Sequence, residues 1–332
     1  MSYYRGRDRR RATLSDWPTM TLTVVACFIF WIIDCCLSVG FPLKSETAIL
    51  PLWGKICEIF GNRFVAYSVG VLLVLFIAFV NKHISDNEML IRERTQLPFM
   101  FFLLLMSSNP GLQPFTEATV VQLCFVFIIY ELFASYQNPE ATGTLFNIGV
   151  LLGTASLFLP QTLWFLPLVW FGMYKFSSLS LRGFLAVLTG ILGVYWLVLT
   201  WCVWKHDYSI ISSFFSSLGD VGLMSPKTYH IGMAGVVFMA LLSFFFINID
   251  AYNNRIRVRD MLAFSLIILM WALIMILLYG SKCDYFLAIV YLPSSVLFAY
   301  ILETIRGRVR FLLYYFMLAL WGLAFLLRIW NY

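Results

Sequence analysis

The sequence has few charged residues for its length. Of its 332 residues, 12 % are charged and 61 % are apolar, against about 25 % and about 45–50 % in a typical soluble domain. So few charges cannot cover a surface that faces water, whereas a surface that faces lipid needs none. The composition therefore excludes a soluble enzyme, an intrinsically disordered chain and a secreted disulfide-rich scaffold, and it predicts an integral membrane protein.

The motifs of common soluble chemistry are also missing. There is no G-x-x-x-x-G-K-[S/T] phosphate-binding loop and no dinucleotide fingerprint after a strand. The seven cysteines form no C-x-x-C pair, and the three histidines have no zinc-ligand spacing. We therefore expect neither a metal site nor a cofactor. The net charge of +6 lies in clusters beside helix ends, where topology and anionic lipid head groups account for it, so we expect no nucleic-acid partner.

Uncharged stretches long enough to cross a bilayer recur along the chain. A spanning helix needs about 17–25 apolar residues. Seven windows qualify, which are 17–33, 64–81, 183–204, 231–249, 261–281, 285–302 and 311–327. Between the second and third windows, prolines such as Pro98 and Pro160 interrupt the apolar sequence. We predict four further crossings there, in the paired regions 98–136 and 144–174, although either pair could instead be a re-entrant hairpin. The predicted fold is all-α, one polytopic bundle of about eleven spans that forms a single integral-membrane domain over residues 1–332.

The distribution of basic residues predicts the orientation. With a cytoplasmic N-terminus, the inner segments hold 16 lysines and arginines and the outer segments hold 7, the bias expected of inner loops. Residues 1–18 are then a basic cytoplasmic segment. The first apolar run ends in Asp34 without a small-x-small cleavage pattern, so its helix is expected to be retained. The predicted location is the cell inner membrane.

Two outer loops, 40–63 and 205–230, carry amphipathic segments. In the first loop Leu52 and Ile56 share an apolar face, and Trp53 is expected to anchor the segment in the membrane interface. The segment is either a surface connector or a lid over an outer pocket. A separate motif, G-x-x-x-G at Gly149 and Gly153, predicts close helix packing.

Acidic residues at membrane depth are the candidate functional groups. A charge inside the bilayer costs roughly 2.5–3.5 kcal/mol on insertion scales. Asp34 ends the first helix and Glu117 begins a helix on the same outer side, so the two can share one aqueous pocket. Glu131 lies about 21 Å further along that helix and cannot join them. Interfacial residues that simply reach water are the alternative reading of all three.

Polar side chains near the prolines complete the predicted site. Prolines shorten the local helices, and their free backbone groups must be satisfied by protein or by water. We therefore expect the proline-rich segments to lie inside the bundle beside a cavity, where Asn109, Gln161 and Glu117 would bind substrate. Glu46 in the first outer loop is a second candidate acidic group beside Asp34.

Over most of its length the chain resembles an uncharacterised family of polytopic inner-membrane proteins typical of Bacteroidetes. The matching segments are Gln96-Leu97-Pro98-Phe99, Ser107-Ser108-Asn109-Pro110, Phe146-Asn147-Ile148-Gly149-Val150-Leu151-Leu152-Gly153 before Pro160, and Ala288-Ile289-Val290-Tyr291-Leu292-Pro293. This resemblance implies a class of protein without an assigned activity.

The chain is also similar to the GT-C glycosyltransferases, polytopic enzymes that take sugars from polyprenyl-phosphate carriers. In those enzymes the first outer loop carries a catalytic acidic residue and interfacial helices. Asp34 or Glu46, with the segment from Leu50 to Gly61, lies where that loop would be. The Asp-Glu pair and the tyrosine that often follow in those enzymes are absent here.

The resemblance implies a protein of cell-envelope glycoconjugate biogenesis that handles a lipid-linked sugar at the outer leaflet. Its partners would be membrane lipids and a polyprenyl-phosphate-linked sugar, with Asp34 or Glu46 as general base. A non-enzymatic membrane subunit or assembly factor is the alternative. A transporter fits less well, because its interrupted helices should occur in both halves of the chain, whereas here they cluster between Pro98 and Tyr174.

Overall fold

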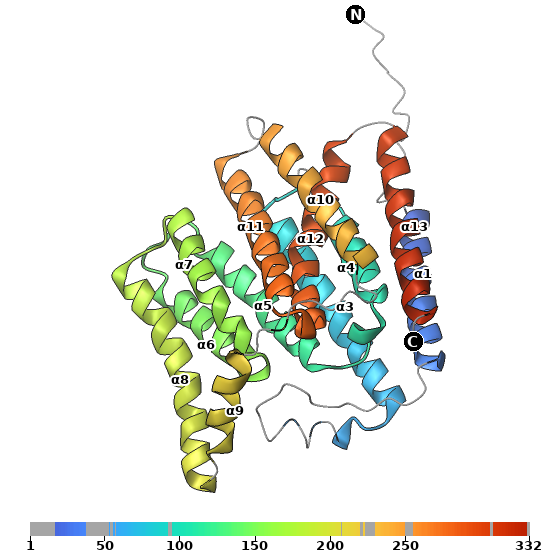
Figure 1. The fold of residues 1–332 in the computed structure, drawn as a ribbon. Coiled ribbons are helices and arrows are strands. Elements are labelled where there is room, and N and C mark those ends of the chain that lie inside the picture. The colour runs from blue at the N-terminus through green and yellow to red at the C-terminus, as the bar shows by residue number, and fades with distance from the viewer. Residues whose placement is uncertain are drawn as a thin grey trace, which may run out of the picture.

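The computed structural model describes residues 17–37, 53, 56, 58–91, 95–206, 208–219, 222, 230–249, 255–305 and 308–330. Every regular element within these ranges is a helix, which confirms the predicted all-α fold (Figure 1). The elements are α1 (Trp17–Leu37), α3 (Arg63–Asn87), α4 (Leu97–Ser107), η1 (Pro110–Leu112), α5 (Glu117–Ala134), α6 (Thr142–Phe158), η2 (Pro160–Phe165), α7 (Leu166–Lys175), α8 (Leu181–Lys205), α9 (Ser209–Leu218), α10 (His230–Ile249), α11 (Ile256–Leu278), η4 (Gly280–Lys282), α12 (Cys283–Thr304) and α13 (Arg308–Trp330).

Seven of the described helices are long and apolar enough to cross a membrane, namely α1, α3, α5, α8, α11, α12 and α13. Five of the seven predicted windows lie within these helices, and a sixth, 261–281, extends three residues past the end of α11. The remaining window, 231–249, forms the apolar helix α10. The seventh long helix, α5, comes from the proline-rich middle of the chain. The protein is thus a multi-pass membrane protein.

Each paired region joins a longer helix to a short one. Helix α4 has 11 residues and α7 has 10, which gives each about half of the roughly 30 Å hydrocarbon thickness. Short 3₁₀ turns that begin at Pro110 and Pro160 interrupt the chain beside them. All but one of the residues of α4 are buried, as expected of a segment inside the bundle. A long helix joined to a short one matches a re-entrant hairpin better than two full membrane crossings.

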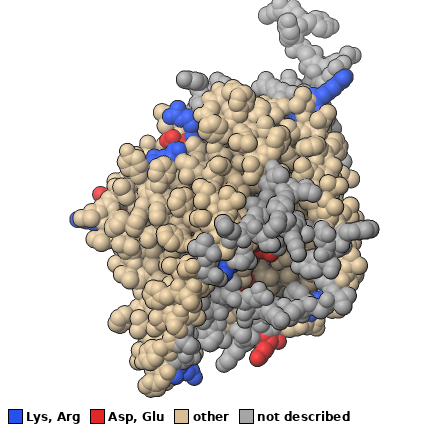
Figure 2. Space-filling model, viewed as in Figure 1, with Lys and Arg blue, Asp and Glu red and all other residues tan. Residues whose placement is uncertain are grey.

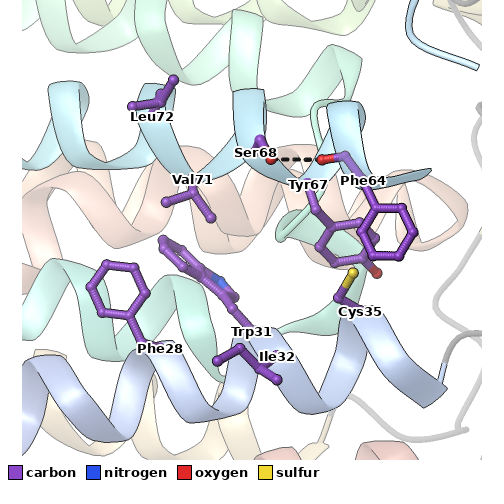
Figure 3. Close-up of a pocket in the computed structure, with 9 residues that line it drawn as sticks. All are labelled: Phe28, Trp31, Ile32, Cys35, Phe64, Tyr67, Ser68, Val71 and Leu72. Atoms are coloured by element: carbon purple, nitrogen blue, oxygen red, sulfur yellow. Dashed lines mark hydrogen bonds between the residues drawn. The ribbon is translucent and has the colours of Figure 1, made fainter. Parts of the chain in front are cut away.

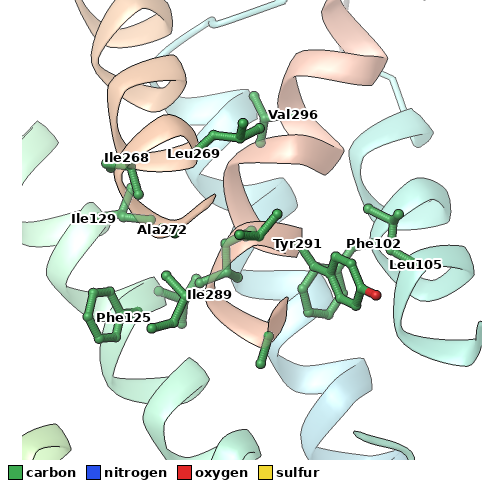
Figure 4. Close-up of a cluster of buried hydrophobic side chains, with 14 of the residues drawn as sticks. Phe102, Leu105, Phe125, Ile129, Ile268, Leu269, Ala272, Ile289, Tyr291 and Val296 are labelled. Atoms are coloured by element: carbon green, nitrogen blue, oxygen red, sulfur yellow. The ribbon is translucent and has the colours of Figure 1, made fainter. Parts of the chain in front are cut away.

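Helix α12 lies at the centre of the bundle and is buried over nearly its whole length. Apolar side chains of α4, α5 and α11 pack around it (Figure 4). Pro293 interrupts its hydrogen bonding, and polar side chains of neighbouring helices supply donors nearby. Asn81 Nδ2 donates to the Leu292 carbonyl at 3.2 Å, and Gln122 Nε2 donates to the Ala288 carbonyl at 2.6 Å. Both amide groups are buried, and these two hydrogen bonds tie α3 and α5 to the backbone of the central helix.

Helices α6 and α8 cross in close contact, as the glycine motif predicts. A Cβ atom added at Gly149 would collide with the Val187 carbonyl, and one added at Gly190 would collide with the Phe146 carbonyl. Gly153 packs against the side chain of Val194. Helix α8 begins where the Ser180 hydroxyl accepts a hydrogen bond from Gly183 N–H at 3.0 Å. The pair forms one side of the bundle (Figure 1).

Ends of three helices that are predicted to be cytoplasmic meet in the structure. Arg257 of α11 pairs with Glu88, just after α3. The guanidinium of Arg257 also lies 5.3 Å from the ring centroid of Tyr136, just after α5. These contacts place the three ends on one side of the membrane.

We expect fluorescent protein fused after Tyr136 or Ser178 to be active, because these positions are predicted to be cytoplasmic. Alkaline phosphatase should instead be active when fused after Ser217 or Lys282, which are predicted to lie on the outer side. The physical reason is that arginines and lysines are retained on the inner side during insertion. Paired alkaline phosphatase and fluorescent protein fusions at the four positions measure this. Reversed readings at all four positions would contradict the predicted orientation.

Candidate functional site

Polar side chains from three helix ends meet at one end of the bundle. Asn109, which precedes η1, donates from Nδ2 to Asp284 Oδ1 at 3.1 Å. The hydroxyl of Tyr285 donates to Glu117 Oε2 at 2.7 Å. Because Asp284 and Tyr285 are neighbours in the first turn of α12, the two pairs lie side by side. We call these four residues, Asn109, Glu117, Asp284 and Tyr285, the carboxylate cluster.

The local sequence explains why the cluster forms. Pro110 opens the 3₁₀ turn η1, and a Cβ atom added at Gly111 would lie 3.3 Å from Asp284 Oδ2. Glycine therefore lets the carboxylate lie close to this turn. Glu117 and Asp284 both occupy the first turn of a helix, where the helix dipole stabilises a negative charge.

The burial of the cluster is what makes it a candidate site. Glu117 is only 3 % exposed and Asn109 only 2 %, while Asp284 and Tyr285 are half-buried. Burial of a carboxylate in an apolar bundle is costly without polar partners, so such groups mark functional positions more often than surface carboxylates do. Acidic atoms are visible inside a hollow on the face shown in Figure 2.

A lysine lies next to the cluster in the chain. Lys282, two residues before Asp284, is 9 % exposed, and it is the only lysine or arginine among the described residues that is classed as buried. Its Nζ donates to the Ser217 hydroxyl in α9 at 2.8 Å. A buried ammonium group is a suitable partner for a phosphate.

Helix α9, in the predicted second outer loop, is held against this end of the bundle. Gln161 Nε2 donates to the Ser217 carbonyl at 2.5 Å, and the Tyr279 hydroxyl donates to the Leu218 carbonyl at 3.4 Å. Gln161 is fully buried, and its Oε1 accepts no hydrogen bond from the described residues, which is also true of Gln113 Oε1. Both oxygens are thus buried without a hydrogen-bond donor among the described residues.

The predicted first outer loop is described in part. Trp53, which the sequence predicts to anchor in the membrane interface, is instead 3 % exposed and packs on the rings of Phe115 and Phe158 at 5.4 and 5.5 Å between centroids. Phe115 lies two residues before Glu117, so this part of the loop contacts the segment that leads into the cluster. Half of the segment from Leu50 to Gly61 lies outside the described residues, as does Glu46.

The structure distributes the predicted site residues over three places. Asn109 and Glu117 belong to the carboxylate cluster, and Gln161 holds α9. Asp34 is buried between α1 and α3, where the Tyr67 hydroxyl donates to its Oδ2 at 2.6 Å and Arg63 donates to its backbone carbonyl at 3.2 Å. A pocket shared by Asp34 and Glu117 stays a prediction. Glu131 lies near the opposite end of α5 and accepts a hydrogen bond from Asn147 at 3.3 Å.

Sequence reasoning missed Asp284 and Tyr285 as site residues, and it counted Lys282 only for topology. The signal that singled out Glu117 was an acidic residue at the outer start of an uncharged helix. Asp284 has the same position before the uncharged stretch 285–302. The same criterion applied to every predicted span would have found it.

Comparisons with known proteins agree with both resemblances seen in the sequence. A family model described as a family of unknown function, DUF6427, matches residues 48–332. No curated protein matches the chain.

Among solved structures, the fold is similar to that of ArnT from Cupriavidus metallidurans bound to undecaprenyl phosphate. The TM-score is 0.53 at 14 % identity, and the match covers 86 % of this chain and 60 % of ArnT, so the chain spans less than two thirds of that protein. At this identity the likeness concerns the fold alone. By the extent of the family match, the chain belongs to the DUF6427 family.

Proposed function

We propose that the protein transfers a sugar from a polyprenyl-phosphate carrier at the outer face of the cell inner membrane, as part of cell-envelope glycoconjugate biogenesis. The observation that carries this proposal is the carboxylate cluster at the first turns of α5 and α12, with the buried Lys282 two residues before Asp284 in the chain. The fold similarity to ArnT, solved with undecaprenyl phosphate, supports a carrier of this chemical class.

Asp284 is the residue that we assign as general base. It is half-buried, whereas Glu117 and Asp34 are 3 % and 6 % exposed, so Asp284 is the most exposed of the three residues. Asp284 would take the proton of the acceptor hydroxyl. The acceptor oxygen would form a bond to the anomeric carbon, and the bond from that carbon to the phosphate oxygen would break. The carrier phosphate leaves with the electron pair of the broken bond.

Lys282 and the Glu117–Tyr285 pair have supporting roles in this proposal. The ammonium group of Lys282 would neutralise the charge that develops on the leaving phosphate, which is an electrostatic contribution to catalysis. Glu117 accepts the hydrogen bond of Tyr285 and so fixes the first turn of α12, which carries Asp284. Glu117 is thus a positioning residue.

Asp34 keeps a structural role in this account. Its carboxylate already accepts the Tyr67 hydrogen bond at 2.6 Å, and this contact joins α1 to α3. The earlier candidates Asp34 and Glu46 remain alternatives for the general base, and conservative substitutions separate them from Asp284.

We expect a deletion strain to accumulate a lipid-linked sugar that its parent consumes. The reason is that the carrier stays loaded when transfer is blocked. Mass spectrometry of the extracted lipid-linked glycans measures the accumulation. The wild-type gene should reverse it, and the gene for the Lys282→Gln variant should reverse it only in part. Identical glycan profiles in deletion strain and parent would contradict the proposed function and would favour a subunit without its own activity.

A further inference from the structure

A groove lies between α1 and α3, and none of its lining residues belongs to the carboxylate cluster (Figure 3). Its volume is about 420 Å³. The buried rings of Trp31 and Tyr67 form its floor, and the exposed side chains of Ile32, Phe64 and Leu72 form its edges. The only hydrogen bond drawn among the lining residues is local, from the Ser68 hydroxyl to the Phe64 carbonyl at 2.7 Å. The groove is therefore lined mainly by hydrocarbon and aromatic groups.

The position of the groove fits one leaflet of the bilayer. Along α3 it runs from Phe64, in the first turn, to Leu72, and along α1 from Phe28 to Cys35, near the end of the helix. At 1.5 Å per residue these stretches are about 10–12 Å long, against a leaflet of about 15 Å of hydrocarbon. Both stretches lie in the predicted outer half of their helices. The groove thus extends from the outer surface toward the bilayer midplane.

The surroundings exclude water as the occupant. Ordered water needs several polar partners, and this groove is apolar over most of its length. An empty groove would deprive its lining of van der Waals contacts. In a bilayer, the molecule that reaches this place is a lipid chain.

An arginine stands at the outer end of the groove. Arg63 is the first residue of α3 and precedes the lining residue Phe64. One of its terminal nitrogens donates to the Asp34 carbonyl, while Nε has no acceptor among the described residues. A guanidinium group at the membrane surface is well suited to bind a phosphate.

We propose that this groove binds one acyl chain of an outer-leaflet glycerophospholipid, with the lipid phosphate beside Arg63. The match between groove length and leaflet thickness favours an acyl chain, because a polyprenyl chain is far longer than the groove. The bound lipid packs between α1 and α3 where Asp34 and Tyr67 join them. This proposal does not depend on the proposed transfer activity.

The test uses the full-length protein in vesicles of phosphatidylglycerol that contain a diazirine-acyl analogue of the same lipid. After illumination, peptide mapping should show several-fold more label on residues 28–35 and 64–72 than on the exposed stretch 192–199 of α8. Val71→Trp should remove that excess because the indole fills the groove, and Arg63→Gln should lower it about fivefold. Leu192→Trp, at a 64 % exposed position of α8, is the matched control and should leave the excess unchanged.

Three results would overturn the proposal. The first is equal labelling of the groove and of α8 in the wild-type protein. The second is an unchanged excess in Val71→Trp and Arg63→Gln variants that elute as the wild type does on size exclusion. The third is displacement of the label by an equimolar amount of undecaprenyl phosphate, which would assign the groove to the carrier instead. If Val71→Trp does not fold, the wild-type map and Arg63→Gln still decide the outcome.

Discussion

Asp284→Asn should lower sugar transfer at least about 100-fold while leaving the amount of folded protein unchanged. A general base typically contributes a factor of about 10²–10⁴, and asparagine has no basic carboxylate. The amide oxygen of asparagine can still accept the hydrogen bond that Asn109 donates to Asp284 Oδ1, so the local fold is kept. The measurement is complementation of the glycan profile of a deletion strain, normalised to protein abundance.

Conservative variants of other acidic residues serve as comparisons. Glu117→Gln keeps an acceptor for the Tyr285 hydroxyl and should cause a smaller loss, as expected of a positioning residue. Glu131→Gln, about 21 Å away along α5, should be silent. If Asp34→Asn or Glu46→Gln abolishes transfer and Asp284→Asn does not, the general base has been assigned to the wrong residue. Full activity in all three variants, Asp284→Asn, Asp34→Asn and Glu46→Gln, would contradict acid–base catalysis.

Gly149→Ala should destabilise the protein by about 1–3 kcal/mol or more, because a single methyl group there meets backbone. The added Cβ would collide with the Val187 carbonyl of α8, and a backbone carbonyl cannot turn away as a side chain does. The helices must therefore separate, and overpacking of this kind is costly. In a membrane, close approach of helices is itself a main source of their association energy. Separating α6 from α8 therefore lowers the stability of the protein directly. Thermal unfolding of the purified protein in detergent measures the effect.

Two glycines on the same helices provide matched controls. A Cβ atom added at Gly143 of α6 or Gly193 of α8 meets no atom within 4 Å. Gly143→Ala and Gly193→Ala should leave the melting temperature unchanged or raise it slightly, because alanine favours the helix. Equal destabilisation by Gly149→Ala and Gly193→Ala would contradict the close crossing of α6 and α8.

Local sequence patterns predicted most of the fold. A run of about 18 apolar residues can satisfy its backbone hydrogen bonds in lipid only as a helix. Windows such as 64–81 were therefore placed correctly. The glycine spacing at Gly149 and Gly153 identified a close contact because only packing requires small residues in an apolar helix. Helix length in the middle of the chain was less predictable. Pro110 and Pro160 show where the helices are interrupted, but a proline does not determine the length of the helix on either side of it.

The candidate site was predicted only in part, because its residues come from distant parts of the chain. Asn109 and Asp284 are 175 residues apart, and Glu117 and Tyr285 are 168 apart. No local pattern pairs them, since the contact depends on α12 being the central helix of the bundle. Trp53 illustrates the same limit. Its sequence context is amphipathic and predicts an interfacial anchor, whereas the aromatic rings of Phe115 and Phe158 bury it.

Binding of the carrier tests the central claim most directly. A ligand that binds only the folded protein stabilises it by RT ln(1 + [L]/Kd), which is about 2.7 kcal/mol at a concentration of 100 Kd. The measurement is thermal unfolding of the purified protein with undecaprenyl phosphate, compared with undecaprenol, which has the same chain without the phosphate.

The account predicts a rise in melting temperature with undecaprenyl phosphate that is absent with undecaprenol, and a rise that becomes much smaller in the Lys282→Gln variant. Lys282→Gln removes the buried ammonium group beside the carboxylate cluster, so the phosphate loses its proposed partner. Equal shifts with both lipids, or no shift with either, would contradict a site for a polyprenyl phosphate at this end of the bundle.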